Sequence, residues 1–117
     1  MDTKDEVRAF LEGFKQKIDI HPEGVIYLHR DKNFQTLADL DIRPIDRTAC
    51  LKNLRVEDYY RGPTIDNEAR SDYWEFGIVV KGQEVYVKIR MGNVGKPVIC
   101  ISFHLAERTI TYPFKSQ

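Results

Sequence analysis

The chain contains 117 residues, of which 42% are apolar and 31% are charged, and its formal net charge is zero. This composition is ordinary for a soluble globular protein, and the length leaves no room for two independent hydrophobic cores. We therefore predict a single domain over residues 1–117.

The charges are distributed unevenly along the chain. Residues 1–80 contain 12 Lys and Arg against 16 Asp and Glu, whereas residues 81–117 contain 6 against 2. A positively charged C-terminal third suits a protein that meets a polyanion through that part of its surface.

The sequence shows no targeting or membrane-spanning segment. Its opening residues, MDTKDEVRAF, form neither a basic leader nor an apolar signal region, and no apolar run approaches the length that crosses a bilayer. We expect a cytoplasmic protein without membrane contact. Cys50 and Cys100 lie in apolar contexts without a CxxC pair, which favours free, reduced thiols.

The chain is predicted to open with an amphipathic helix. Thr3 and Glu6 match a capping box, and apolar residues follow at helical spacing from Val7 to Ile18. After a break at Pro22, residues 25–29 form a β-like run that either adds an edge strand or leads into the next helix.

Two more helices are predicted before the strands begin. Asn33 is placed as the cap of the first, and Pro44 in the first turn of the second. Residues 56–63 then form an aromatic strand or turn that ends at a Gly-Pro break, and residues 64–72 are predicted to be a surface loop.

Residues 73–89 indicate a tight β-hairpin. Two alternating runs flank Lys81-Gly82, where glycine can adopt a positive φ without steric cost. With these two residues as the loop, one face of the hairpin is wholly apolar. On the other face Glu75 lies opposite Lys88, and Tyr86 opposite Gly77.

A third strand over residues 98–104 is predicted to join this hairpin. Its alternation places Ile99, Ile101 and Phe103 on the apolar side, which carries Cys100, Ser102 and His104 to the polar side. The polar side is then expected to gather the following six groups: Glu75, Tyr86, Lys88, Arg90, Ser102 and His104.

Helices that precede strands, without βαβ alternation, predict an α+β fold. In this fold the N-terminal helices cover one face of an antiparallel sheet and leave the opposite, polar face open. A half-buried sheet ordinarily carries charged and polar residues on its solvated face, so an ordinary wet surface is the alternative interpretation. The combination of an imidazole, a phenol, two cations and a carboxylate favours a site instead.

Several kinds of catalytic site are poorly supported. The three histidines lack metal-ligand spacing, so we expect neither a metal nor another cofactor. Cys100 and His104 lie about 13 Å apart along a strand, too far for a nucleophile pair. The strand-turn-helix elbow of a serine hydrolase is also missing.

Metal-free cleavage of RNA fits the predicted polar face better. The substrate supplies its own 2′-hydroxyl as nucleophile, and the protein needs only a base, an acid and cations. Lys88, Arg90 and Arg61 are candidates to stabilise the phosphorane, and His104, Tyr86 or Glu75 to move protons. Exposed aromatic residues nearby, such as Tyr86, Tyr59 and Tyr60, are candidates to stack on splayed bases.

The runs LRVEDYYRGP, YWEFG, VKGQEVYVKI and VICISFH, over residues 51–104, resemble the MqsR-type toxins of bacterial type II toxin–antitoxin systems. These toxins are RelE-like mRNA interferases. The resemblance implies a RelE-like antiparallel sheet with helices on one side, and a cognate antitoxin, with a helix-turn-helix DNA-binding part, as partner.

The family's active-site positions fall on five residues of this chain, of which Tyr86 and Lys88 match the family's residue types. The other three differ: Arg61 stands for a lysine, Glu75 for a glutamine and His104 for a lysine. An ionised Glu75 would repel a phosphate unless Lys88 neutralises it. The resemblance and the polar face together assign catalytic roles to His104, Tyr86, Lys88, Arg61 and Glu75, and substrate binding to Arg90, Ser102, Tyr60 and Trp74.

The leading hypothesis is therefore a toxin that acts as a metal-independent endoribonuclease on single-stranded mRNA. The alternative is a catalytically silent RelE-like module that binds a protein partner through its open sheet or an exposed edge strand.

Overall fold

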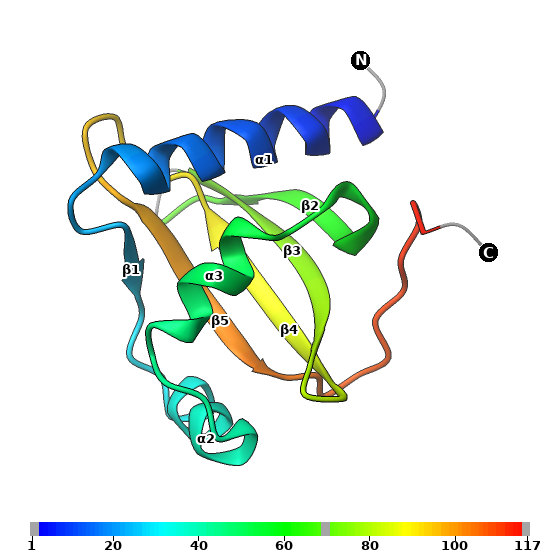
Figure 1. Cartoon of the computed structure of the whole chain (residues 1–117). Helices are drawn as coiled ribbons and strands as arrows, with labels where there is room; N and C mark the ends of the chain where they lie inside the picture. The colour runs from blue at the N-terminus through cyan, green and yellow to red at the C-terminus, as the bar shows by residue number, and fades with distance from the viewer. Residues whose placement is uncertain (1–2, 69–70, 116–117) are drawn as a thin grey trace.

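The computed structural model describes residues 3–68 and 71–115. Its elements follow one another as helices first and strands later, with one short strand between the first two helices (Figure 1). In chain order they are α1 (Thr3–Ile20), β1 (Val25–Tyr27), α2 (Asp31–Leu40), α3 (Asp46–Lys52), the 3₁₀ turn η1 (Val56–Asp58), β2 (Tyr59–Asp66), β3 (Ser71–Val80), β4 (Gln83–Arg90) and β5 (Val98–Leu105).

The strands form one five-stranded sheet in the order β1-β5-β4-β3-β2. Neighbours are antiparallel except at one edge, where β1 runs parallel to β5. The α+β class is confirmed, and residues 25–29 contribute an edge strand. The expectation of a purely antiparallel sheet is wrong, because the chain leaves α1 and enters the sheet beside β5 in the same direction.

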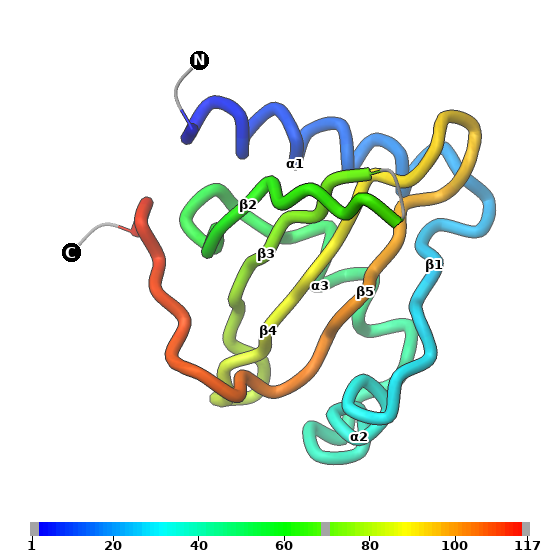
Figure 2. The backbone as a smooth tube through the Cα atoms, turned by 180° about the vertical axis from the view of Figure 1, so that it is seen from behind, coloured from blue at the N-terminus to red at the C-terminus, as the bar shows by residue number. Residues whose placement is uncertain are grey.

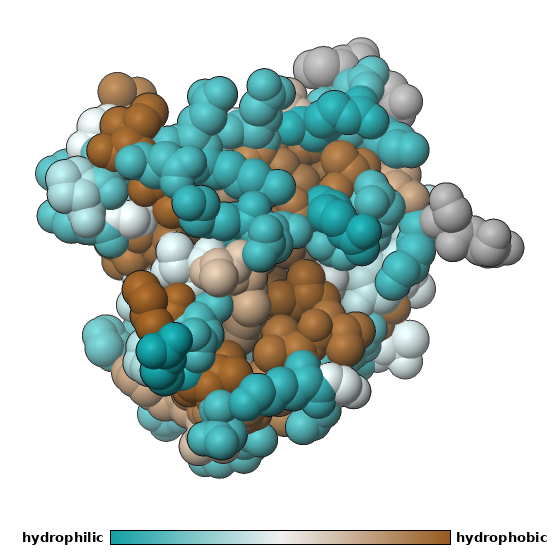
Figure 3. Space-filling model, viewed as in Figure 1, coloured by the Kyte–Doolittle hydropathy of each residue, from teal (hydrophilic) through white to brown (hydrophobic). Residues whose placement is uncertain are grey.

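One face of the sheet packs against helices α1 and α3 (Figure 1). The apolar stripe of α1 lies on this face, where the Phe10 ring stacks on Trp74 with centroids 4.6 Å apart. The outer surface of α1 is hydrophilic, whereas apolar side chains gather between α3 and the β3–β4 hairpin (Figure 3). Burial of this stripe, rather than helix propensity, is what holds α1 in place.

The β3–β4 hairpin has the register that its turn predicted. Lys81 and Gly82 form the loop with φ angles of 49° and 80°, as a two-residue hairpin turn requires. Glu75 lies opposite Lys88, and Gly77 lies opposite Tyr86. The alternation of this hairpin is therefore confirmed.

The alternation of β5 is interrupted by a bulge. Lys88 pairs with Ser102 and Ile89 with Cys100, so Ile101 is an extra residue. Ser102 and His104 keep their predicted face, but Cys100 turns into the core, where it is 1% exposed. The predicted placement of Cys100 on the polar side is wrong. The extra residue Ile101 shifts the alternation by one, so residues of β5 that precede it point to the face opposite to the predicted one.

Helix α2 covers the edge of β5 instead of a face of the sheet. The buried Asn33 amide donates hydrogen bonds to the carbonyls of Leu28 and Ile101, and its oxygen accepts one from the Phe103 N–H. Thr36 Oγ1 accepts a bond from the Leu105 N–H. Asn33 is therefore not a helix cap: α2 begins at Asp31, and Asn33 pairs with strand backbone that would otherwise lie open. The third helix likewise begins at Asp46, with Pro44 in the turn before it.

In the predicted surface loop over residues 64–72, residues 64–66 and 71–72 are strand, and residues 69–70 lie outside the described part of the chain. Strand β2 continues to Asp66 and β3 begins at Ser71, with Thr64 paired to Tyr73. The sheet curls at this end, and in the view from behind β2 passes in front of β4 (Figure 2). A 2.9 Å ion pair between Asp66 and Arg90 joins the two strands across the face.

The C-terminal segment, residues 106–115, also covers part of the second face. It leaves β5 with a bond from the Ala106 N–H to the Glu84 carbonyl and returns along β3 (Figures 1 and 2). Ile110 and Tyr112 lie against Gly77 on this face. The Phe114 ring instead stacks at 5.1 Å on Tyr59, a residue of the core. The predicted open face is therefore covered at both ends of β3. In residues 3–68 and 71–115, no helix combines the length and apolarity that a membrane span needs.

Candidate functional site

The second face of the sheet, here called the polar face, carries the predicted site residues on β3, β4 and β5 except Trp74. Strand register places Tyr86 opposite His104 and Lys88 opposite Ser102. On the β3 side, Glu75 lies opposite both Lys88 and Arg61, the latter on β2. The sheet therefore brings together all five residues with predicted catalytic roles, from four strands.

Glu75 is the buried centre of this group, with 2% of its surface exposed. Its two carboxylate oxygens accept hydrogen bonds from Arg61, at 2.6 Å from Nε and 3.2 Å from Nη2. The Tyr86 hydroxyl donates a further, short bond to Oε1. The predicted partner Lys88 is only the backbone neighbour, and it is Arg61 that forms the ion pair.

The contacts with Glu75 shift the pKa values of Arg61 and Tyr86. The hydrogen bond to Glu75 raises the pKa of the Arg61 guanidinium, which stays charged. Burial and the bond to Glu75 raise the pKa of the Tyr86 phenol well above its usual range. Tyr86 is therefore a neutral donor that is already engaged, and Glu75 acts as an orienting group between two side chains.

His104 lies at the end of β5, with its ring centroid 5.2 Å from that of Tyr86. Its Nδ1 is 2.9 Å from the Leu105 carbonyl oxygen, and 4.0 Å from Oε1 of Glu107. A carbonyl only accepts hydrogen bonds, so Nδ1 carries the proton and the neutral ring keeps its lone pair on Nε2. In this tautomer the imidazole can take a proton through Nε2.

Two further cations lie farther along β4. The Lys88 ammonium sits 4.4 Å from the centroid of the Tyr73 ring, and burial lowers the pKa of this lysine. Arg90 pairs with Asp66, and its Nε is buried without a hydrogen-bond partner among the described residues. Ser102, opposite Lys88 on β5, is 3% exposed.

The aromatic residues predicted to contact the substrate do not all lie at the site. Tyr59 is buried in the core. Tyr60 is half-buried beside the site, and the Arg61 guanidinium lies 4.8 Å from its ring centroid. Trp74 faces the opposite side of the sheet and belongs to the core, with 8% of its surface exposed. Trp74 is therefore not placed to contact a substrate on the polar face, because adjacent strand residues point to opposite faces.

A pocket of about 220 Å³ opens beside His104 and Tyr86. Tyr60 and Arg61 line it from β2, and Glu107, Arg108, Thr109 and Ile110 line it from the C-terminal segment. The predicted site did not include these last four residues. The alternation of Ile110, Tyr112 and Phe114 is the signal that this segment packs back onto the sheet.

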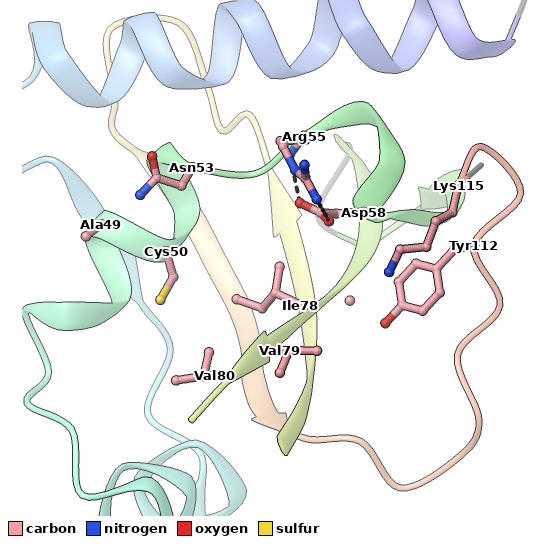
Figure 4. Close-up of a pocket in the computed structure, with 11 residues that line it drawn as sticks. Ala49, Cys50, Asn53, Arg55, Asp58, Ile78, Val79, Val80, Tyr112 and Lys115 are labelled. Carbon is pink, nitrogen blue, oxygen red and sulfur yellow. Dashed lines mark hydrogen bonds and ion pairs between the residues drawn. The ribbon is translucent and has the colours of Figure 1, made fainter. Parts of the chain in front are cut away.

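A second pocket, of about 400 Å³, lies on the helix side of the β3 edge (Figure 4). Ile78, Val79 and Val80 of β3 form one wall, and Cys50 of α3 lies across from them (Figure 4). The Tyr112 and Lys115 side chains reach it from the C-terminal segment. None of the predicted site residues lines this pocket.

Within the part of the chain that the structure describes, no three His, Cys, Asp or Glu side chains gather as a candidate metal site. Cys50 and Cys100 are both free thiols, and burial raises the pKa of Cys100 to about 12. Comparison with family models, with curated proteins and with solved structures yields no match to this chain.

Proposed function

We propose that this protein is a metal-independent endoribonuclease, the toxin component of a type II toxin–antitoxin system, acting on single-stranded mRNA. The observation that carries the proposal is His104, whose Nδ1–H is held by the Leu105 carbonyl beside a pocket that Arg61 also lines. A base with an available lone pair and a permanent cation at one pocket is what cleavage through a 2′-hydroxyl requires.

In the proposed reaction, Nε2 of His104 removes the proton of the 2′-hydroxyl, and the 2′-oxygen attacks the adjacent phosphorus. The bond from phosphorus to the 5′-oxygen breaks, which leaves a 2′,3′-cyclic phosphate. Lys88, whose lowered pKa eases proton release, protonates the departing 5′-oxygen. Arg61 stabilises the extra negative charge of the phosphorane.

Glu75 does not oppose this reaction in the proposed arrangement. Its charge is neutralised by Arg61, whose side chain remains 58% exposed while that of Glu75 is 3% exposed. Arg61 therefore faces outward to a phosphate while Glu75 holds it from below. The Tyr86 ring packs against the His104 ring and fixes its position.

The direct test is incubation of the purified chain with labelled single-stranded RNA and with DNA of the same sequence, each with and without EDTA. We expect EDTA-resistant cleavage of RNA alone, leaving cyclic or 3′-phosphate ends. His104→Ala should lower the rate by about a hundredfold or more. His29→Ala is the matched control, since His29 stacks on Phe34 away from the site and its loss should leave the rate unchanged.

The same variants can be examined in cells. Expression of the wild-type chain should arrest growth, and His104→Ala or Lys88→Ala should relieve the arrest while the circular dichroism spectrum stays native. Full toxicity in both variants would sink the assigned mechanism. Rescue by the product of an adjacent small reading frame would identify the proposed antitoxin.

One observation favours the alternative, a silent module that binds a protein partner. Strand β3 extends beyond Phe76, its last residue paired to β2. The C-terminal segment covers Gly77, and Ile78–Val80 then form a sheet edge that β2 does not pair with. Val79 is 68% exposed there, and the 400 Å³ pocket follows this edge (Figure 4). An extended partner strand could add at this edge. A natively folded chain that cleaves no RNA would favour this second function.

A further inference from the structure

The pocket beside His104 has the size and lining of a site for one flat ring system. Its volume of about 220 Å³ is below the roughly 300–1,000 Å³ of sites that hold drug-sized ligands. Tyr60, Tyr86 and His104 supply aromatic surface at this pocket. Aromatic side chains of this kind stack on single-stranded bases regardless of their identity.

The rest of the lining is largely polar and suited to reading the edge of a base. It includes Glu107, Arg108 and Thr109, ahead of the buried Ile110. Lys32 of α2 reaches Glu107 with a 2.7 Å contact between Nζ and Oε1, which ties the C-terminal segment to α2. The Glu107 carboxylate is therefore held beside the pocket by an ion pair with Lys32, which does not itself line the pocket.

The charge of Glu107 determines which hydrogen bonds this side chain can make. The bond from Lys32 lowers the pKa of this carboxyl, which is consequently ionised at neutral pH. An ionised carboxylate only accepts hydrogen bonds, and its lone pairs can serve several donors. Adenine, cytosine and guanine each carry an exocyclic amino donor, at N6, N4 and N2 respectively. Uracil carries none, and its single donor, N3–H, lies between two carbonyl oxygens that repel a carboxylate.

The location of the pocket indicates which nucleotide it would hold. The 2′-hydroxyl is attached to the ribose carbon next to the one that bears the base. His104 lines the pocket, so a nucleotide whose 2′-hydroxyl reaches Nε2 has its base within reach of the same walls.

We infer that this pocket holds the base of the nucleotide whose 2′-hydroxyl attacks, and that Glu107 selects bases with an exocyclic amino group over uracil. The place of that nucleotide in the reaction rests on the proposed ribonuclease activity. The binding of a base with this preference is independent of that activity.

The test uses the four nucleoside 3′-monophosphates, titrated into the full chain and followed by amide chemical shifts of the pocket residues. The adenosine, cytidine and guanosine nucleotides should each bind about tenfold or more tightly than the uridine nucleotide, the range that one well-made edge contact supplies. Glu107→Gln should reduce the ratio to less than about threefold, because a carboxamide both donates and accepts. Glu23→Gln, at an exposed carboxylate in the turn after α1, should preserve the ratio.

Equal affinity for all four nucleotides, no binding of any of them, or an unchanged ratio in Glu107→Gln would each overturn the inference. Cleavage of four oligonucleotides that differ only in the base before the scissile bond separates the two proposals. Selective binding without cleavage would refute the proposed nuclease activity but not the base site. Cleavage at equal rates after all four bases would refute the base site but not the nuclease activity.

Discussion

The Arg61 guanidinium binds both carboxylate oxygens of Glu75, and the two side chains differ sharply in exposure, at 58% and 3%. Arg61 is therefore exposed to solvent, whereas Glu75 is buried. Such a pair presents a cation at the surface and provides a neutral interior at the same time. The pair defines the proposed site and also contributes to the stability of the sheet.

Removal of Arg61 should destabilise the protein, because Glu75 would remain buried without its counter-charge. We expect Arg61→Ala to lower the free energy of unfolding by about 2 kcal/mol, below the 3–5 kcal/mol of a fully buried pair since Arg61 is partly exposed. Urea denaturation measures this. Arg8→Ala, which breaks an exposed pair with Asp5, should cost under about 0.5 kcal/mol, and equal costs for the two variants would refute a special role for Glu75.

Tyr86→Phe should separate the two roles open to this tyrosine. The hydroxyl is engaged by Glu75 and its pKa is raised, so its loss should change the RNA cleavage rate by less than about threefold. Tyr86→Ala also removes the ring beside His104 and should slow cleavage by about tenfold or more. A Phe variant as slow as His104→Ala would instead make the phenol a proton-transfer group.

Gly77 should tolerate no side chain while the C-terminal segment stays in place. A Cβ at this position would collide with the Tyr112 hydroxyl and would lie 2.9 Å from Cδ1 of Ile110. We expect Gly77→Ala to cost about 1–3 kcal/mol and to speed hydrogen exchange around Ile110. Gly13→Ala is the comparison, since its Cβ would meet only the flexible end of Met91 at 3.3 Å, and it should be stable and leave that exchange unchanged.

Loss of the Asn33 amide should open the β5 edge. Asn33→Ala leaves the Leu28 and Ile101 carbonyls and the Phe103 N–H without this partner, so we expect a cost of about 3 kcal/mol. The Phe103 amide should exchange faster with solvent. Gln35→Ala, on the exposed side of the same helix, is expected to cost less than about 0.5 kcal/mol. Unchanged exchange at Phe103 in Asn33→Ala would contradict the edge-covering role.

Stability should decline in alkali partly through Tyr27. Burial raises the pKa of this phenol to about 12, against 10.0 for the free group. The folded state keeps the proton over that interval and the unfolded state releases it, so this contribution is present below about pH 10 and is lost as the pH rises toward 12. Between these pH values the free energy of unfolding should fall less steeply with pH in Tyr27→Phe than in the wild type. The difference in slope should approach that of one proton, about 1.4 kcal/mol per pH unit. An identical slope in both proteins would exclude the shift.

The sequence by itself determined the parts of the site that depend on local periodicity. A two-residue turn at Lys81-Gly82 and a period of two place Glu75, Tyr86 and Lys88 on one face, and the structure agrees. The stripe of α1 follows in the same way from a period of 3.6. Ser102 and His104 also keep their predicted face, because they follow the bulge in β5.

The tertiary structure decided what those residues contact. Alternation cannot identify the second neighbour of a strand, so Lys88 rather than Arg61 was the expected partner of Glu75. Nor does it reveal an inserted residue such as Ile101, or the place on the sheet, over Gly77, to which the C-terminal segment returns. These features depend on packing between residues far apart in the chain. Arg61 and Glu107 therefore complete the proposed site only once β2 and the C-terminal segment have closed around it.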